Sequence, residues 1–408
     1  MNMRGRVRVA YVNHTGAVSG AEVVLMNMVR GLDRSAYEPV VICPAEGGLA
    51  RQFHVEGVPC MELPAVQARF TWRLGGLWKA VTSVARAIGA LRRTLWQVDP
   101  EIVHANSVRA GIVVSLACIA SGRKVVWHVH DNLPRHPLST VIRIAALVLR
   151  PDRVIAVSQA TAQAFRGHFS FAESVVTIHN GVDLIEFPLK GAERSALRFA
   201  LGVPEGAFLV CAVGQICARK GLLELIEAFT IAHTRTPDLH LIIAGSVLFE
   251  HEKPYLDRLY QAAANPSVAG SIRFIGQIQD VSVLLRAADL LVLNSHEEPF
   301  GLVLIEAMSS GTPVLATRTG GIPEIVRDTE NGWLVDKGDT AGLARKLLEL
   351  AGHKELLDRA ARQAHETTCP QFSVERFQAQ IHDCYAGMLA IEKHALSGRP
   401  QWARPANE

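Results

Sequence analysis

The stretch EPFGLVLIE, residues 298–306, lies at the centre of the pattern that decides the fold. Its proline and its glycine interrupt regular structure, and apolar residues then recur at helical spacing from Leu302 to Met308. The following Gly-Thr-Pro ends the periodic pattern. A helix is therefore predicted over residues 301–310.

Short β-rich runs alternate with helix-length amphipathic segments through both halves of the chain. This order is typical of α/β proteins built from doubly wound parallel sheets, and it predicts two Rossmann-like domains. Ligands of such sheets bind at the carboxyl ends of the strands, so a cleft between the two domains is the expected site. The predicted strands are 6–12, 38–43, 101–104, 124–129, 153–157, 174–178, 208–213, 239–244, 271–275, 289–293, 313–317 and 332–335.

The composition describes an ordinary globular protein of two or three domains, with 408 residues, 49% hydrophobic and 20% charged. A net charge of +3, without a basic cluster interleaved with aromatic residues, argues against a nucleic-acid partner. The first residues lead directly into a strand with no signal-peptide pattern, and the apolar runs are too short to cross a bilayer. A cytoplasmic protein is therefore expected.

Glu298 and Glu306 are carboxylates on the predicted loop and helix, respectively. Amides at a helix start favour anions, so the backbone near Leu302 can seat a diphosphate. A carboxylate can accept two hydroxyl protons, so Glu298 can hold a sugar and Glu306 a ribose diol. The alternative is that Glu298 caps the helix and Glu306 is merely exposed.

The chain around these residues resembles the retaining, GT-B-fold glycosyltransferases of family 4, whose signature is a Glu, seven residues and a second Glu. Further blocks occur in the family's order and together span about nine tenths of the chain, whereas each block alone is a weak signal. They are SGAEVVLMNMVRGL (19–32), IVHANS (102–107), VHDN (129–132), VIAVSQATAQAF through TIHNGVD (to 183), AVGQICARKGLLELIEAF (212–229), FIGQIQDVSVLLRAADLLVLNS (274–295) and AMSSGTPVLATRTGGIPEIV, which follows Glu306.

The resemblance implies an acceptor-side domain over 1–185, a linker over 186–204 and a nucleotide-sugar domain over 205–371. The linker is also indicated by prolines and glycines among charged residues. A closing helix over 372–396 would cross back onto the first domain, as in the resembled family. The tail, 397–408, is expected to be disordered because it is rich in Pro, Arg and Ala.

Two loops offer groups for the donor phosphates. The loop before Gly20 opens a helix, where a glycine amide can approach a phosphate closely; a tight turn without a ligand is the alternative. Lys220 lies at the end of the first strand of the second domain, where a cation would meet the diphosphate, unless it is a solvated surface lysine. The family commonly has Arg at Gln215, and Arg219 is the candidate to replace that charge. The donor-binding prediction comprises Gly20, Gln215, Arg219, Lys220, Ile278, Glu298, Phe300, Gly301, Leu302 and Glu306. By resemblance, the block at Ile278 would contact the base mainly through its backbone.

His130 and Asp131 follow a strand whose alternation places His128 and His130 on one side. By resemblance, His130 would bond the transferred sugar near its anomeric centre and Asp131 would meet the acceptor. A structural strand-end histidine is the alternative for His130. Glu324, in a tight turn before a helix, is either a sugar contact or a helix cap. The catalytic prediction therefore comprises His130, Lys220 and Glu298.

Residues 69–96 predict a long amphipathic helix with a buried apolar stripe. The outer face carries tryptophan and basic residues, which suits contact with anionic lipid through the helix at 74–96, although solvated surface is the alternative. The predicted stripe is Leu74, Leu77, Val81, Val84, Ile88, Leu91 and Leu95, opposite Trp72, Lys79, Arg86 and Arg93.

The resemblance thus implies an enzyme that moves a hexose-type sugar from a nucleoside diphosphate to the hydroxyl of a carbohydrate or lipid-linked acceptor, with retention, in bacterial polysaccharide or glycoconjugate biosynthesis. No cofactor is expected, and the absence of an Asp-x-Asp motif near the site predicts metal independence. An epimerase or a phosphorylase would share this architecture but lacks support from the motifs. A non-catalytic nucleotide-sugar sensor or scaffold with the same fold remains the principal alternative.

Overall fold

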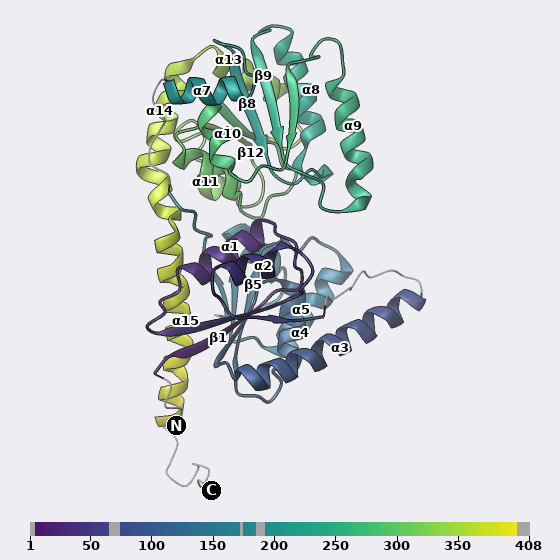
Figure 1. The fold of residues 1–408 in the computed structure, drawn as a ribbon, viewed down its shortest axis with the longest axis vertical. Coiled ribbons are helices and arrows are strands. Elements are labelled where there is room, and N and C mark those ends of the chain that lie inside the picture. Colours follow the sequence, from purple (N-terminus) through teal and green to yellow (C-terminus); the bar gives the residue numbers. More distant parts are fainter. Residues whose placement is uncertain (1–4, 65–73, 172–173, 185–191, 398–408) are drawn as a thin grey trace. The chain divides into compact units, whose positions relative to one another are not determined.

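The computed structural model describes residues 5–64, 74–171, 174–184 and 192–397 (Figure 1). Their contacts divide the chain into two compact units. Unit 1 comprises 1–181 and 374–408, and unit 2 comprises 182–373. The sequence predicts domain limits at 185 and 371, a few residues from the two positions at which the contacts change unit.

Unit 1 is built on a seven-stranded parallel sheet in the order β3-β2-β1-β4-β5-β6-β7. The strand order reverses between β1 and β4, so the loops after these two strands diverge to opposite sides. The sequence predicts every strand except β3, whose three residues are too few to show a periodic pattern. The strands are β1 Val7–Val12, β2 Tyr37–Cys43, β3 Cys60–Glu62, β4 Ile102–Ala105, β5 Lys124–Val129, β6 Arg153–Ala156 and β7 Val175–Thr177.

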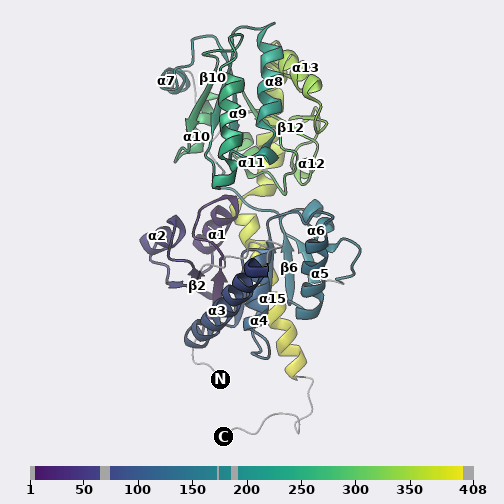
Figure 2. The same cartoon turned by 90° about the vertical axis from the view of Figure 1, so that its right-hand side faces the viewer.

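Helices cover both faces of this sheet. On one face α3, α4 and α5 pack over an apolar core, and this is the side turned to the viewer in Figure 2. On the other face Tyr11 and His104 contact Tyr385 of α15, which also packs on α1. The closing helix therefore belongs to unit 1, as the resemblance implies. The helices are α1 Gly20–Arg30, α2 Gly48–Val55, α3 Leu74–Val98, α4 Val108–Ala117, α5 Pro137–Leu149, α6 Gln159–Arg166 and α15 Val374–Ser397.

Helix α3 has the predicted amphipathic character over the side chains that can be described. Leu91 and Leu95 are buried, Val84 and Ile88 pack partly against the same core, and Arg86 and Arg93 are exposed. The described side chains or residues do not include the other predicted stripe positions, Leu74, Leu77 and Val81, the outer-face residues Trp72 and Lys79, or residues 398–408 of the predicted tail. Among the described helices, none combines the length and apolar character needed to cross a bilayer.

Unit 2 is built on a six-stranded parallel sheet in the order β10-β9-β8-β11-β12-β13, and every strand was predictable from its apolar run. The order reverses between β8 and β11. The strands are β8 Phe208–Val213, β9 Leu239–Ala244, β10 Ile272–Gly276, β11 Leu290–Leu293, β12 Val314–Thr317 and β13 Trp333–Val335.

One face of the second sheet packs against α8, α9, α13 and α14 around a continuous apolar core, whereas α10 and α11 pack against the other (Figure 1). The predicted helix over 301–310 is α11, Leu302–Ser309. The other helices of unit 2 are α7 Ala192–Ala200, α8 Leu222–His233, α9 Lys253–Ala263, α10 Val281–Ala287, α12 Ile322–Ile325, α13 Thr340–Ala351 and α14 Lys354–Gln363, with short helical turns at Ala218–Lys220, Glu250–Glu252, Ala364–Thr368 and Cys369–Phe372.

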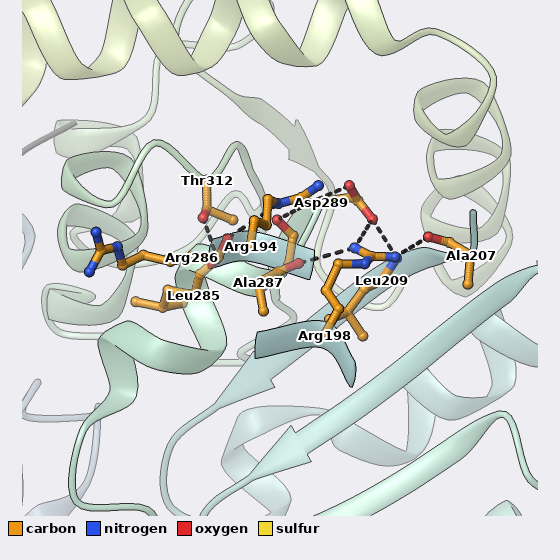
Figure 3. Close-up of polar contacts among 10 residues, drawn as sticks. Arg194, Arg198, Ala207, Leu209, Leu285, Arg286, Ala287, Asp289 and Thr312 are labelled. Carbon is orange, nitrogen blue, oxygen red and sulfur yellow. Dashed lines mark hydrogen bonds and ion pairs between the residues drawn. The ribbon is translucent and has the colours of Figure 1, made fainter. Parts of the chain in front are cut away.

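Helix α7 occupies part of the segment that the sequence assigns to a linker, 186–204, and it is anchored to unit 2 by polar contacts (Figure 3). Arg194 donates to Asp289 over 2.6 Å and Arg198 over 2.9 Å, and both also donate to backbone carbonyls at the end of α10. The amide of Leu209 donates to the same carboxylate over 2.7 Å. Asp289 therefore joins α7, β8 and β11.

Replacing Asp289 with alanine is expected to lower the free energy of unfolding of unit 2 by about 2–4 kcal/mol, because two arginines and one amide lose their acceptor. Native-state hydrogen exchange of the β8 and β11 amides measures this loss. Asp336→Ala is the control, because its ion pair with Arg318 is solvent-exposed and long, at 3.7 Å. Equal protection of these amides in Asp289→Ala and the control would contradict the assignment.

Candidate functional site

A pocket in unit 2 lies at the point where the strand order reverses. It is lined by the carboxyl ends of β8, β9 and β11 and by Gln215 and Lys220 from the loop after β8. Parallel α/β sheets bind their ligands at such reversal points, because the loops on either side lead away from each other and leave a crevice. Gln215 and Lys220, which the sequence predicts to bind the donor, therefore line a pocket at the place where such sheets bind their ligands.

Lys220 and Glu298 form an ion pair beside this pocket. Lys220 Nζ lies 2.5 Å from Glu298 Oε2, and the side chains are only 14% and 10% exposed. Ser295 Oγ donates to the same Oε2 over 3.0 Å. Among the described residues, Glu298 Oε1 has no hydrogen-bond partner, so one oxygen of the carboxylate can still accept a hydroxyl.

Gly221 allows the turn that carries Lys220 to lie against the loop after β11. Its φ of +60° is in the left-handed region that favours glycine. A Cβ at this position would lie 2.1 Å from the backbone oxygen of Asn294, whose side-chain Nδ2 in turn donates to Gly221 O over 2.8 Å. The turn formed by the local sequence ARKG thus brings Lys220 into contact with Glu298, 78 positions further along the chain.

The start of α11 is also shaped by a glycine. Gly301 has a φ of +106° immediately before Leu302, the first residue of the helix, and Phe300 is buried against Phe372 with ring centroids 5.7 Å apart. Gly321 donates its amide to Glu298 O over 3.0 Å, which ties the turn before α12 to the Glu298 loop. The partly buried Glu324 follows on α12.

The two residues considered for a second phosphate charge have different surroundings. Gln215 Nε2 donates to Glu252 over 2.9 Å, whereas Arg219 is exposed and donates to the backbone oxygen of Glu297 over 3.0 Å. Arg219 therefore lies beside the Glu298 loop. Ile278 follows β10 at the same carboxyl edge of the sheet and is partly exposed.

Glu306 projects from α11 in a partly buried position. Burial raises the pKa of its carboxyl group from the ordinary value to about 6. Its carboxylate has no hydrogen-bond partner among the described residues. A desolvated acceptor without a partner is costly to the fold and available to a ligand.

Unit 1 gathers polar residues at the reversal point of its own sheet. Asn13 follows β1, Asn106 follows β4 and His130 follows β5; His130 Nε2 lies 3.0 Å from Asn106 Oδ1. Burial lowers the pKa of His130 to about 3, so its ring is neutral. Asp131 is exposed beside it, and Gly20 is the exposed first residue of α1.

Three polar residues at the carboxyl edges of the two sheets are not among the residues predicted from the sequence: Asn13, Asn106 and Ser295. Each directly follows, or lies two residues after, a strand that flanks a reversal point. Applying the carboxyl-end rule to the predicted strands one residue at a time would have found them.

Two family models match the chain: Glycosyl transferases group 1 over residues 193–367 and Glycosyltransferase Family 4 over residues 18–186. The D-inositol 3-phosphate glycosyltransferase of Salinispora arenicola is 33% identical over 406 residues, covering 92% of this chain and 89% of that protein. The chain is a family 4, group 1 glycosyltransferase. 

Other relatives of this glycosyltransferase support the same family and its fold. The lipopolysaccharide core biosynthesis glycosyltransferase LpsE of Rhizobium meliloti is 36% identical over 193 residues, but the match spans only 47% of this chain and 53% of LpsE. Anabaena HepE, in a crystal structure with UDP-glucose, has a TM-score of 0.81 and 27% identity, covering 94% of this chain and all of HepE. The predicted GT-B fold class is thereby confirmed.

Replacing Glu306 with glutamine is expected to stabilise the ligand-free glycosyltransferase above pH 6. Because the folded pKa lies above the ordinary value, the burial penalty is absent below pH 4.5 and fully present above pH 6. The gain at pH 8 should approach about 2 kcal/mol and vanish near pH 4.5. Thermal unfolding across this pH range tests it, with the exposed Glu227→Gln as control. A gain that is the same at both pH values would contradict the assignment.

Proposed function

We propose that this glycosyltransferase moves a hexose-type sugar from a nucleoside diphosphate to an acceptor hydroxyl with retention of the anomeric configuration. The observation that carries the proposal is the Lys220–Glu298 ion pair at the reversal point of the second sheet, in which Glu298 Oε1 has no partner within the described part of the chain. Glu306, also without a partner among the described residues, is eight positions further along the chain.

In this proposal the diphosphate is bound by Lys220 and by the amides at the start of α11 near Gly301 and Leu302. A lysine has three donors, so Lys220 can keep its bond to Glu298 and also bond a phosphate oxygen. The leaving diphosphate gains negative charge during transfer, and groups already oriented toward it lower the barrier. Arg219 and Gly20 are the further proposed contacts, Arg219 in place of the arginine missing at Gln215.

The sugar, the ribose and the base of the donor are each assigned to residues whose chemistry suits them. Oε1 of Glu298 accepts a sugar hydroxyl, and the Glu306 carboxylate accepts from the ribose diol. Ile278 lies beside the base, which its backbone contacts, and the buried Phe300 holds the loop against Phe372. His130 bonds the transferred sugar, while Asp131 and Glu324 are proposed acceptor or sugar contacts.

Retention follows if both reacting oxygens use the same face of the sugar. The bond from the anomeric carbon to the phosphate oxygen breaks, the acceptor oxygen bonds to that carbon on the same face, and the acceptor proton passes to the leaving phosphate. Lysine and amides supply the charge stabilisation in this scheme, so we propose that transfer needs no metal ion or other cofactor.

The relatives indicate which substrates to test first. HepE was crystallised with UDP-glucose and LpsE carries a name from lipopolysaccharide core biosynthesis, so a UDP-sugar and a carbohydrate or lipid-linked acceptor are proposed here. Polysaccharide or glycoconjugate biosynthesis in the cytoplasm is the corresponding role. Gln215 stands where the family commonly has an arginine, and its side chain donates to Glu252. The positive charge of that arginine is therefore missing, which favours the second candidate, a non-catalytic nucleotide-sugar sensor or scaffold.

We further propose that unit 1 rests on anionic lipid, where a lipid-linked acceptor would be found. Helices α3, α4 and α5 contain no Asp or Glu, and Arg86, Arg93 and Arg109 are exposed on them. On α5 the side chains of Val141 and Val148 are also exposed, at 59% and 74%. Basic and apolar groups on one layer suit the headgroup region of an anionic membrane.

A true donor is expected to raise the melting temperature of the wild-type chain in a panel of UDP-, GDP- and ADP-sugars. At a ligand concentration of 100 times Kd, the stabilisation is about 2.7 kcal/mol by mass action. Glu306→Ala should abolish the shift, because the ribose loses its acceptor, whereas the exposed Glu227→Ala should retain it.

The same donor is then supplied with acceptors in the presence of EDTA, and the product is followed by NMR of the anomeric proton. Transfer or slow donor hydrolysis with retained configuration agrees with the proposal. Donor binding without either reaction would favour the sensor, and a shift that survives Glu306→Ala would remove the ribose assignment.

The wild-type chain should co-sediment with anionic vesicles at low salt, and binding should weaken as salt rises. Arg86→Glu with Arg93→Glu should release it, since each basic residue near the surface contributes about 1 kcal/mol. Arg345→Glu with Arg359→Glu, exposed on unit 2, is the matched control. Failure of the wild type to sediment, or equal release by both pairs, would end the membrane proposal.

A further inference from the structure

A buried chain of hydrogen bonds leads from α1 to His130. Glu22 accepts from Asn13 Nδ2 over 3.1 Å, and Asn13 Oδ1 accepts from Asn106 Nδ2 over 3.1 Å. Asn106 Oδ1 then lies 3.0 Å from His130 Nε2. Glu22, Asn13 and Asn106 are at most 3% exposed, so water does not compete for these bonds.

The neighbours of Asn13 determine which way its amide points. Its Nδ2 faces the backbone oxygen of Thr15 at 2.7 Å and the carboxylate of Glu22, which also accepts from the amide of Ser19. Both neighbours of the nitrogen are acceptors. Reversing the amide would set oxygen against oxygen at two contacts, so Oδ1 must point toward Asn106.

The neighbours of Asn106 determine the direction of its amide in the same way. Its Nδ2 faces two acceptors, Asn13 Oδ1 and the backbone oxygen of Ala21 at 3.2 Å. Its Oδ1 therefore points toward His130 Nε2, and an amide oxygen can only accept. A bond at this contact requires a hydrogen on Nε2. In a neutral imidazole the other nitrogen, Nδ1, then carries a lone pair.

We propose that Asn106, aligned by Asn13 and Glu22, is a positioning residue that holds His130 as the Nε2–H tautomer and so presents Nδ1 to the substrate as an acceptor only. No partner of Nδ1 occurs among the described residues. The consequence for the substrate rests on the proposed function, in which His130 meets the transferred sugar.

An acceptor-only nitrogen selects the chemical class of the sugar group that faces it. A hydroxyl can donate to Nδ1, whereas a carboxylate would place lone pairs against a lone pair. The site is therefore expected to favour a neutral hexose over a uronic acid. This preference extends the proposed function, which leaves the sugar unspecified beyond a hexose type.

The titratable groups around His130 leave this state undisturbed. The ring of His128 lies beside it, with centroids 4.2 Å apart and the planes tilted by 35°. His104 Nε2 on the neighbouring strand lies 3.2 Å from His128 Nδ1. Burial lowers the pKa of His104 to about 3 and that of His128 well below the ordinary value, so both are neutral. Tyr385 of α15 bonds His104 over 2.7 Å, and among the described residues no carboxylate forms a hydrogen bond with the His130 ring.

Long-range ¹H–¹⁵N NMR of the full chain with labelled histidine measures the tautomer directly, with His130→Gln identifying the signal. The wild type should show Nε2 protonated and Nδ1 unprotonated from pH 5 to 8. Asn106→Asp keeps the acceptor but adds a negative charge, which should raise the pKa of His130 because a nearby carboxylate favours imidazolium.

Ser115→Ala is the matched control, because it removes another buried hydrogen bond of unit 1, donated by Trp127 Nε1 over 2.9 Å. It should leave the His130 signals and their titration unchanged. A wild-type signal with hydrogen on Nδ1, or an Asn106→Asp titration equal to that of the wild type, would overturn the proposal. Because these spectra use the ligand-free chain, failure of every donor to bind would sink the proposed function and leave this result standing.

A second readout tests the sugar preference. The ratio of the affinities for UDP-glucose and UDP-glucuronate, measured by calorimetry, should fall by at least about tenfold in Asn106→Asp, because imidazolium can donate to a carboxylate. The ratio should be unchanged in Ser115→Ala. An unchanged ratio in Asn106→Asp would overturn the selection of a hydroxyl, even if the tautomer is as proposed.

Discussion

The ion pair between Lys220 and Glu298 is the interaction on which the proposed donor site of unit 2 depends. Two charges with little solvent exposure stabilise each other only while both are present, since removing one leaves the other uncompensated. The pair also joins the loop after β8 to the loop after β11, the two strands at which the sheet order reverses. The proposed donor binding and the local fold therefore rely on the same contact, which already orients donors and acceptors in the ligand-free chain.

Unit 1 has no ion pair at its reversal point among the residues that the structure describes. Its sheet turns polar residues toward α1 and α15 on one face, while the opposite face of the same strands is apolar. Amides and neutral rings, each with a fixed direction, transmit orientation from Glu22 to His130. The two units thus use different chemistry at equivalent positions: a lysine–glutamate ion pair in one, and a chain of directed hydrogen bonds in the other.

Most of the fold could be predicted from the sequence because buried parallel strands appear as apolar runs separated by amphipathic helices. Strand β3 could not be predicted, because three residues are too few to show a periodic pattern. Helix α7 could not be predicted either, because Arg194 and Arg198, which anchor it, bind Asp289 about ninety positions away. The site residues were predicted by resemblance and by loop position. Their pairing was not, because nothing local indicates that Lys220 contacts Glu298 or that Asn106 faces His130.

The most direct measurement is a crystal structure of the chain with a bound UDP-sugar. We expect a diphosphate oxygen at about 3 Å from Lys220 Nζ, a sugar hydroxyl on Glu298 Oε1 and the ribose diol on Glu306. A nucleotide bound elsewhere, with Lys220 and Glu298 paired only to each other and Glu306 facing solvent, would contradict it.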